Sequence, residues 1–587
     1  MPQITASDGL DHVVPGVYGS IQVQQGAAAP QPTFQVPVLI ADSDSGYPSN
    51  WLSNADKFTI EANTLPFVRV GDATQAKRIF GGDLAQIFSN AKNNGLPMAW
   101  CIGAGKMRRS GVIVRSTGPV AEFDLAAFYW GFPGNWVKIK WASSIFSYIV
   151  PTKLVKVTAN AAAGATRVYV TDSSWAVPGM ALEIGDNDTA NEAITVRRAG
   201  VDFSSTGQPL PYIDLTAALS GTFATADYAA VALYGPTAVT SPTFSAGQGQ
   251  NLIDWLNSTQ VNGMRVFRAQ RRAITFTGAL PIAVSSLTPV KQVAAWGAVT
   301  LGTSPAASAS DYADFIDDLT TLLPQFIAAV KAIPRAWFAG TTSLTAQQSW
   351  RNYAITQRAD NKPISVTVGC AWRDVDLTAS DSTNPIYRAG QINSEDVDLV
   401  ACGADGYGSY LTLAAAKWGR MCGSGIPHNL TNDPFIGFTT FEAKWSGTDL
   451  ESLCQGGVVT YSLPFINGVV QPCISQGLST LQTNLSTWNI DNTTWSRQLR
   501  DNADLVDRAL RLDMESQIVG HEVDVNAVRA VGVARGAALL RQGYLAALPT
   551  LTQVVRNPEQ NGWTVTWQVL LPGLTDYVDL TTLITPE

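Results

Sequence analysis

The hydrophobic pattern of the chain changes abruptly at Pro151, and this change limits the possible folds more than any other feature. Before Pro151, helical and strand periods alternate, which is typical of an α/β protein. Between Lys153 and Pro236, short apolar strands recur about every ten residues and are separated by Gly, Asn and Asp turns. From residue 245 onward, helical and strand periods alternate again. The pattern predicts an all-β module, a small barrel or sandwich, inserted into an α/β protein.

The α/β part has clear start and stop signals before the inserted module. Strands are expected at 34–41, 64–70 and 98–102, and a helix at 84–94 that Gly95 ends. Asp72 is the predicted N-cap of an earlier helix, and Thr345 of a later one. The elements expected after the module are helices at 252–257, 312–333, 346–360, 411–421 and 450–454, strands at 273–277, 364–368 and 398–402, and a hairpin of 456–461 with 468–472.

The C-terminal part predicts a long charged helix, a second and more apolar helix, and two strands. Apolar residues from Trp495 to Ile518 recur at three- and four-residue steps, and charged residues occupy the opposite face. The second helix is expected at 523–548, and the strands at 563–569 and 577–584. A final strand without an internal partner would offer an open edge to another chain.

The N-terminal part contains a strand-like run at 13–23 that is broken at Pro15 and Gly16 and followed by a flexible segment, 24–32. A strand followed by a spacer suits an arm that leaves the subunit. The same pattern also suits an ordinary edge strand of the chain's own sheet, and the residues do not decide between the two.

Composition excludes several classes of protein. The 587 residues suffice for several domains, yet only 15% are charged and 17 are Trp, which suggests that other protein covers much of the surface. The net charge of −8, with no strongly basic segment, argues against a nucleic-acid partner. Six scattered cysteines and three histidines argue against a zinc site and favour reduced thiols. Neither a signal peptide nor an apolar run of membrane-spanning length is present, so we expect a soluble protein made in a cytoplasm.

Candidate chemical motifs are weak. The run Gly103-Ala-Gly105-Lys106 lacks the P-loop spacing, and the glycine-rich stretch 403–408 lacks the dinucleotide fingerprint. Two acid pairs, Asp374 with Asp376 and Asp396 with Asp398, are interpreted as solvated carboxylates in loops. We therefore expect no catalytic, cofactor-binding or metal-binding residues, and no cofactor. The alternative of a different class is an α/β enzyme with a β-barrel binding domain and 403–408 as its ligand loop.

The order of several segments resembles a known family. They are 15–18 (Pro-Gly-Val-Tyr), 36–40 (Val-Pro-Val-Leu-Ile), 68–72 (Val-Arg-Val-Gly-Asp), 79–82 (Ile-Phe-Gly-Gly), 414–421 (Ala-Ala-Ala-Lys-Trp-Gly-Arg-Met) and 453–459 (Leu-Cys-Gln-Gly-Gly-Val-Val), followed by the two C-terminal helices and the closing strand. In this order they resemble the contractile tail sheath proteins of myophages, R-type pyocins and related injection machines. The β module departs from a minimal sheath, although larger sheaths carry extra domains on the outside.

The resemblance implies a structural subunit that forms stacked hexameric rings around an inner tail tube and contracts. It implies contacts with the subunit itself, the tube protein, and baseplate and terminator proteins, in a virion tail assembled in the bacterial cytoplasm. Both terminal arms would add strands to neighbouring subunits. The arm residues implied are Val14, Val17, Tyr18, Ile21, Val23, Tyr577, Val578, Leu580, Leu583 and Ile584. Another tail or baseplate structural protein is the alternative within the same class.

The charged face of the first C-terminal helix is our candidate for the tube contact, and an ordinary solvated helix face is the alternative. Its residues are Arg497, Arg500, Asp504, Arg508 and Arg511. The expected architecture is a mixed α/β and α+β multidomain chain. Its parts are an N-terminal arm (1–32), an α/β domain in two parts (33–150 and 237–490), the β module (151–236), a helix-helix-strand inner domain (491–574) and a C-terminal arm (575–587).

Overall fold

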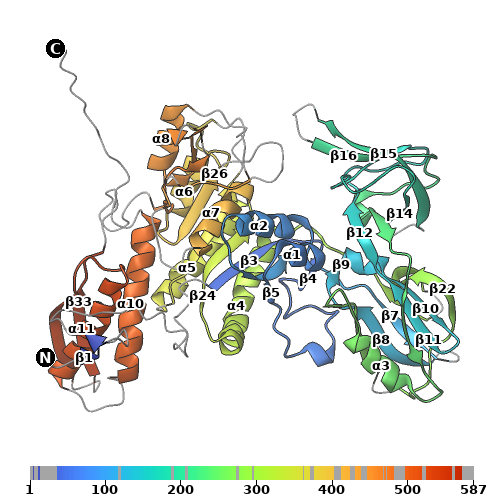
Figure 1. Ribbon diagram of the computed structural model, residues 1–587, viewed down its shortest axis with the longest axis horizontal. Coiled ribbons are helices and arrows are strands. Elements are labelled where there is room, and N and C mark those ends of the chain that lie inside the picture. Colours follow the sequence, from blue (N-terminus) through green and yellow to red (C-terminus); the bar gives the residue numbers. More distant parts are fainter. Residues whose placement is uncertain are drawn as a thin grey trace.

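The computed structural model describes most of the chain between residues 36 and 571. The described residues are 4–5, 11–12, 36–116, 120–186, 191–204, 209–272, 276–293, 296–360, 362–370, 376–401, 411–423, 430–431, 433–437, 446–463, 465–466, 469–470, 472–481, 496–517, 524–557 and 562–571. Figure 1 shows the C-terminal helices at one end of the molecule, an α/β sheet in the centre and two β-rich parts at the other end. The protein is thus a mixed α/β multidomain chain.

The central sheet has seven strands in the order β27-β26-β25-β24-β3-β6-β5. Its strands are β3 (Val36–Asp42), β5 (Val68–Val70), β6 (Ala99–Ala104), β24 (Pro334–Gly340), β25 (Ser365–Cys370), β26 (Val397–Ala401) and β27 (Val458–Val459). The pairs are parallel except for β5, which runs antiparallel to β6. Every residue of β25 and β26 is buried, so helices cover both faces of the sheet.

The helices of this domain begin at polar caps. They are α1 (Ala73–Ile79), α2 (Gly82–Asn93), α4 (Ala309–Val330), α5 (Leu344–Ala359), α6 (Pro385–Ile392), α7 (Leu411–Gly423) and α8 (Gly447–Gln455). Asp72 caps α1 as predicted, with its carboxylate accepting from the Gln75 N–H at 2.8 Å. The predicted cap Thr345 was wrong, because α5 begins earlier and Ser343 caps it.

Two four-stranded sheets pack on a shared apolar core next to the α/β domain, and we call this part the β-sandwich. Its elements are β10 (Lys138–Ala142), β11 (Ile145–Ile149), β18 (Val239–Thr243) and β22 (Val284–Pro289) in one sheet, β7 (Gly111–Arg115), β8 (Ala121–Ala127), β21 (Phe267–Arg271) and β23 (Val299–Thr300) in the other, and the helix α3 (Gly249–Ser258). The sequence assigned 105–150 and 237–300 to the α/β domain. In the structure, β7, β8, β10 and β11 of the first segment, and β18, α3, β21, β22 and β23 of the second, belong to the β-sandwich. One reason is the turn between β10 and β11, which places Ser143 and Ser144 at positive φ without a glycine signal.

The inserted β module is a ring of six strands in the order β12-β17-β14-β15-β16-β13. These are β12 (Pro151–Lys156), β13 (Arg167–Tyr169), β14 (Ala181–Gly185), β15 (Glu192–Phe203), β16 (Pro209–Leu215) and β17 (Ala230–Tyr234). A bridge between Val157 and Val170 joins the first and last strands of this order. We therefore call the module the β-barrel.

The C-terminal helices and a β-hairpin form a small separate core. The elements are α10 (Arg497–Gln517), α11 (Val525–Arg541), β32 (Thr550–Asn557) and β33 (Gly562–Gln568). The two helices and the strand β33 were predicted. The second helix is shorter than predicted and ends before Gly543, which has a φ of +81°, and β32 was missed.

Short strand pairs complete the described chain. They are β1 (Ile4–Thr5) with β2 (Asp11–His12), β4 (Ser45–Gly46) with β9 (Trp130–Gly131), β19 (Gln260–Val261) with β20 (Met264–Arg265), β28 (Tyr461–Ser462) with β31 (Cys473–Ile474), and β29 (Phe465–Ile466) with β30 (Val469–Val470). The predicted pairing of 456–461 with 468–472 was wrong, because β27 joins the central sheet, β28 pairs with β31, and β30 pairs with β29. The described helices include none that is long and apolar enough to span a membrane.

Candidate assembly surface

The carboxyl edge of the central sheet is where an α/β enzyme of this topology would bind its ligand. The chain runs from β3 to β6 on one side and from β24 to β25 on the other, so the strand order reverses between β3 and β24. At this point the Asp42 carboxylate accepts from the Ala307 N–H at 2.9 Å, and the Tyr312 hydroxyl donates to the Gly340 carbonyl at 2.8 Å. The start of α4 therefore fills the position of a ligand.

Asp42, at this edge of the sheet, has a raised pKa. Burial raises the pKa of Asp42 to about 6, and the nearby Asp83 and Asp311 act in the same direction. The Ala307 N–H and the Lys156 ammonium oppose this effect. Among the described residues, no group of His, Cys, Asp and Glu side chains could hold a metal ion.

The glycine run at 103–105 is also bound to the chain itself. The Gly103 N–H donates to the Tyr47 carbonyl at 2.9 Å, and the Gly105 N–H donates to the Ser49 hydroxyl at 3.0 Å. Lys106 pairs with two aspartates of α4, at 3.1 and 3.3 Å. The backbone groups that would cradle a phosphate therefore have internal partners. The other glycine run, 403–408, lies outside the described residues.

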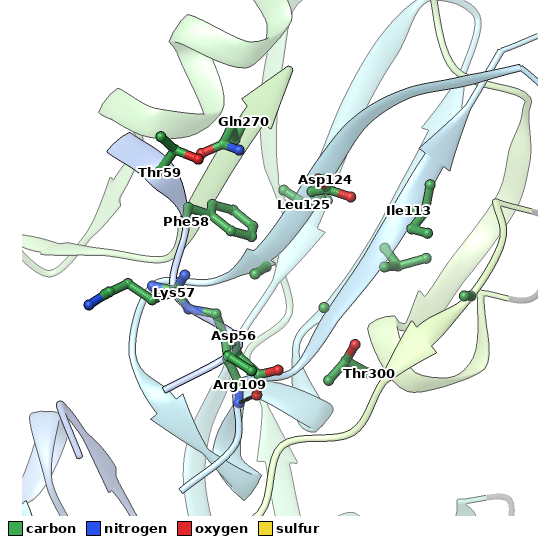
Figure 2. Close-up of a pocket in the computed structure, with 15 residues that line it drawn as sticks. Asp56, Lys57, Phe58, Thr59, Arg109, Ile113, Asp124, Leu125, Gln270 and Thr300 are labelled. Atoms are coloured by element: carbon green, nitrogen blue, oxygen red, sulfur yellow. Dashed lines mark hydrogen bonds between the residues drawn. The ribbon is translucent and has the colours of Figure 1, made fainter. Parts of the chain in front are cut away.

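A cleft of about 310 Å³ lies between residues 55–59 and the sheet that contains β7 and β8. Figure 2 shows the Phe58 ring on one side of this cleft and Asp124 on the other. Its charged groups have partners: Asp124 accepts from Arg272 at 2.9 Å, and Asp56 accepts from the Arg109 N–H at 3.0 Å. We find no paired acid and base free to act on a substrate there.

Arg109, at the base of this cleft, joins the α/β domain to the β-sandwich. Its guanidinium donates twice to the Glu61 carboxylate, at 2.7 and 2.8 Å, and both side chains are almost completely buried. The same guanidinium lies 3.6 Å from the centre of the Trp130 ring, and Arg268 of β21 contacts Glu61 at 3.2 Å. The charge pair is thus part of a firm joint between two domains rather than a reactive site.

The charged face of α10 packs against the amino edge of the central sheet, opposite the filled ligand position. Arg497 and Asp504 are 1% and 3% exposed. Arg500 and Arg508 are half-buried, and the side chain of Arg511 lies outside the described part. Whether this face also contacts a tube stays a prediction, but two of its five residues are covered by the chain's own α/β domain.

Asp504 of α10 is the centre of the outer half of this contact. Its carboxylate accepts from Arg358 at 2.8 Å, from Arg335 at 3.0 Å and from Arg500 of its own helix at 2.8 Å. Burial raises the pKa of Asp504, against the opposing effect of the arginines. Arg358 also pairs with Asp396, and Arg500 with Glu395 at 3.2 Å.

The inner half of the contact lies at the first turn of α10. Arg497 donates to the Asp501 carboxylate and to the Glu395 carbonyl, and its guanidinium lies 3.9 Å from Asp398. Asp398 in turn pairs with Lys417 of α7, and both side chains are fully buried. The interpretation of Asp396 and Asp398 as solvated loop acids was therefore wrong, because the docked helix covers them. Asp376 is exposed and binds Thr378, and Asp374 lies outside the described residues.

Sequence reasoning missed the α/β partners of this helix. They are Arg335 in β24, Arg358 in α5 and Glu395 before β26. A usable signal was present, since Arg335 is a charged residue within an otherwise apolar strand. A charge in such a position requires a buried partner.

The C-terminal hairpin is the described surface best suited to strand addition. β32 and β33 pair with each other, and neither has a further partner strand among the described residues. One face of the hairpin packs against α11, where Gly532 lies against the Trp567 ring. All ten residues predicted for the two arms lie outside the described residues.

Comparisons with known proteins give a fold. No protein-family model matches the chain, and no curated protein does. A sheath tail protein from Desulfitobacterium hafniense is 10% identical, with 95% of this chain and 100% of that chain covered and a TM-score of 0.50. A sheath tail protein from Listeria innocua is 11% identical, covers 92% of each chain and has a TM-score of 0.48. The helical sheath of the anti-feeding prophage in its contracted state is 13% identical, with 49% of this chain and 78% of that chain covered and a TM-score of 0.35.

The first of these similarities carries weight, since it spans nearly the whole of both chains. At this identity it shows a shared fold, and the resemblance noted from the sequence is confirmed at that level. The other two fall below a TM-score of 0.5, and we base nothing on them.

Proposed function

We propose that this chain, which has the fold of a bacterial sheath tail protein, is a structural subunit of a contractile, phage-type tail sheath. The observation that carries the proposal is the shared fold over 95% of this chain and 100% of the sheath protein. The sheath polymerises around an inner tube and contracts to drive the tube through the envelope of a target cell. Contraction is then a cooperative change between two packings of one subunit.

The open edges of β32 and β33 support a polymer held by strand exchange. Neither β32 nor β33 has a second partner strand among the described residues, so an added strand would pair the outer backbone groups of the hairpin and stabilise it. We propose that the arms 1–32 and 575–587 supply these strands to neighbouring subunits. Each added backbone hydrogen bond contributes about 1 kcal/mol, and the contacts repeat along the polymer.

The partners proposed are further copies in stacked hexameric rings, an inner tube protein, and baseplate and terminator proteins. The place proposed is a virion tail assembled in the bacterial cytoplasm. Because the α/β domain covers Arg497 and Asp504, we place the tube contact toward the end of the helix that carries Arg508 and Arg511. We keep the other domain boundaries proposed from the sequence, but assign most of 105–150 and 237–300 to the β-sandwich.

Electron microscopy of the purified full chain at high concentration tests the proposal. We expect striated tubes or stacked rings. If only single particles form, alone and with a co-expressed candidate tube protein, the sheath proposal is wrong.

Truncated chains test the arms separately. Deleting 1–23 or 575–587 should leave a folded subunit, with an unchanged far-ultraviolet circular dichroism spectrum, that no longer assembles. Tubes formed by a truncated chain would disprove the arm assignment and leave the sheath proposal standing.

A ligand screen tests the enzyme alternative. A nucleotide or sugar that raises the melting temperature would favour an enzyme, since a ligand stabilises only the state that binds it. We expect no such ligand, because the chain itself fills the carboxyl edge of the sheet.

A further inference from the structure

The contact between α10 and the α/β domain differs in kind from the joint between the β-sandwich and the β-barrel. The joint between the β-sandwich and the β-barrel contains a buried apolar cluster, built from residues such as Phe132 and Trp136. In the described part of the chain, no buried apolar cluster has members from both the α/β domain and the C-terminal helices. Charged side chains make this contact instead.

The outer half of the contact is electrically balanced on both sides. The α/β domain contributes two arginines and two acids, and α10 contributes Arg500 and Asp504. The α/β residues are Arg335, Arg358, Glu395 and Asp396. Separation of the two surfaces therefore leaves no net charge on either side.

The free energy of such a contact is a small difference between large terms. Burying charges costs several kcal/mol for each ion, and pairing recovers a similar amount. When the surfaces separate, all six side chains become hydrated. Neither buried apolar cluster is divided by this separation, because the two clusters share no members.

The first turn of α10 supplies a pivot for this separation. Ser496 forms a β-bridge with Leu478, and the Arg497 N–H donates to the Gly477 carbonyl at 3.0 Å. Leu478 belongs to the core of the α/β domain. The start of the helix is thus held by backbone bonds, whereas the turns around Asp504 are held by side-chain charges.

We propose that the outer charge network is an ionic latch: α10 opens from and closes on the α/β domain about its first turn, while both domains stay folded. The latch makes the orientation of the C-terminal domain an equilibrium that a charged partner or salt can shift. This inference concerns the single subunit and does not depend on the proposed function.

Hydrogen–deuterium exchange of the full chain, read by peptide mass spectrometry, tests the latch. Asp504→Asn removes the carboxylate that three arginines share, and Arg358→Met removes the arginine that joins Asp396 to Asp504. Each variant should speed exchange in peptides from 500–517 by roughly tenfold or more. Exchange in β3 and β25 should stay as in the wild type.

The double variant distinguishes a single unit from independent contacts. Residues of one latch are coupled, so the effect of Asp504→Asn with Arg358→Met should be clearly less than the product of the single effects. The control is Asp513→Asn, which removes a contact with Arg535 of α11 inside the C-terminal domain, 2.7 Å long. It should leave exchange at 500–510 unchanged.

Salt provides a measurement that needs no variant. The rate of exchange in 500–517 of the wild type should rise as NaCl is raised from about 0.05 to about 1 M in roughly threefold steps of concentration. The reason is that salt ions stabilise the separated charges. The proposal fails if exchange rises equally in the central sheet, if it does not rise at all, or if the two substitutions act independently.

Discussion

Tyr148 and Val239 face each other across an antiparallel ladder of the β-sandwich, although the whole β-barrel lies between them in the sequence. The barrel therefore leaves and re-enters its host at neighbouring positions on β11 and β18. An insertion with adjacent ends can be removed without breaking the strands that carry it.

Replacing 149–238 with Asn-Gly should give a folded chain without the β-barrel. The new turn joins two strands that already pair, and Asn-Gly suits a two-residue hairpin. We expect circular dichroism of the shortened chain to lose β signal and keep its helical signal. Size-exclusion chromatography should show soluble protein without aggregates.

Exposure of Phe132 and Trp136, which pack against the barrel, is the main risk of that deletion. A second variant that also carries Phe132→Ser separates this effect, because aggregation from exposed aromatic surface should then diminish. Loss of helical signal in both variants would mean that the barrel is needed for folding.

The pH dependence of stability should reveal Asp42. Its pKa is raised from 3.8 to about 6 by burial, so the folded chain binds this proton more tightly than the unfolded chain. The contribution of Asp42 to stability is complete below pH 3.8 and is lost as the pH rises through 6. Asp42→Asn should therefore stabilise the protein at pH 7.5 by about 1–3 kcal/mol and change little at pH 4.

Asp311 is the matched control for this prediction, since its pKa moves the other way. Burial opposes ionisation of Asp311, but hydrogen bonds from Ser308 and Lys106 outweigh it and lower the pKa. Asp311→Asn should destabilise the protein at pH 7.5, and the loss should shrink as the pH falls below 3.8. Denaturant midpoints at pH 7.5 and pH 4 measure the stability of the two variants. If both substitutions changed the stability at pH 7.5 in the same direction, the opposite pKa shifts of Asp42 and Asp311 would be contradicted.

Local signals in the sequence predicted most elements of the α/β domain, but missed the strand β24 and the helix α6. β3 is apolar from Val36 to Ala41, β26 is apolar except for Asp398, and α2 and α7 show a clear helical period, so each was placed within a few residues. The β-sandwich was not foreseen, because β11 pairs with β18 across the inserted barrel. Pairing over such a distance leaves no local trace in the sequence.

The candidate surface was predicted in outline and misplaced in detail. Periodicity correctly put Arg497 and Asp504 on one face of a helix. It could not show what covers that face, because Arg335 and Arg358 are far away in the sequence. A buried charged face and a solvated one have the same pattern, and only the partners distinguish them.

The buried pair of Lys417 and Asp398 should behave as a unit. Lys417→Met leaves a carboxylate without its main partner in the core and should cost about 3–5 kcal/mol. Adding Asp398→Asn should recover part of that loss, since no unpaired charge then remains between α7 and β26. Chemical denaturation followed by Trp fluorescence measures both variants.

Lys362→Met is the control. Because Lys362 is exposed, this substitution should change the free energy of unfolding by less than about 0.5 kcal/mol. If the double variant loses as much unfolding free energy as the two single variants together, Lys417 and Asp398 are not coupled.

The close contact of α11 with the hairpin should make Gly532 intolerant of a side chain. A Cβ at this position would overlap the Trp567 ring, so the ring or the helix would have to move. Gly532→Val should destabilise the C-terminal domain by about 1–3 kcal/mol, as overpacking does elsewhere. Ala534→Val is the matched control, since Ala534 is exposed on the same helix and its substitution costs only helix propensity. Proteolysis of the full chain reads the result: the Gly532 variant should lose the C-terminal fragment first while the Ala534 variant resists like the wild type. Equal resistance of both variants would mean that the hairpin is not packed on α11 through this glycine.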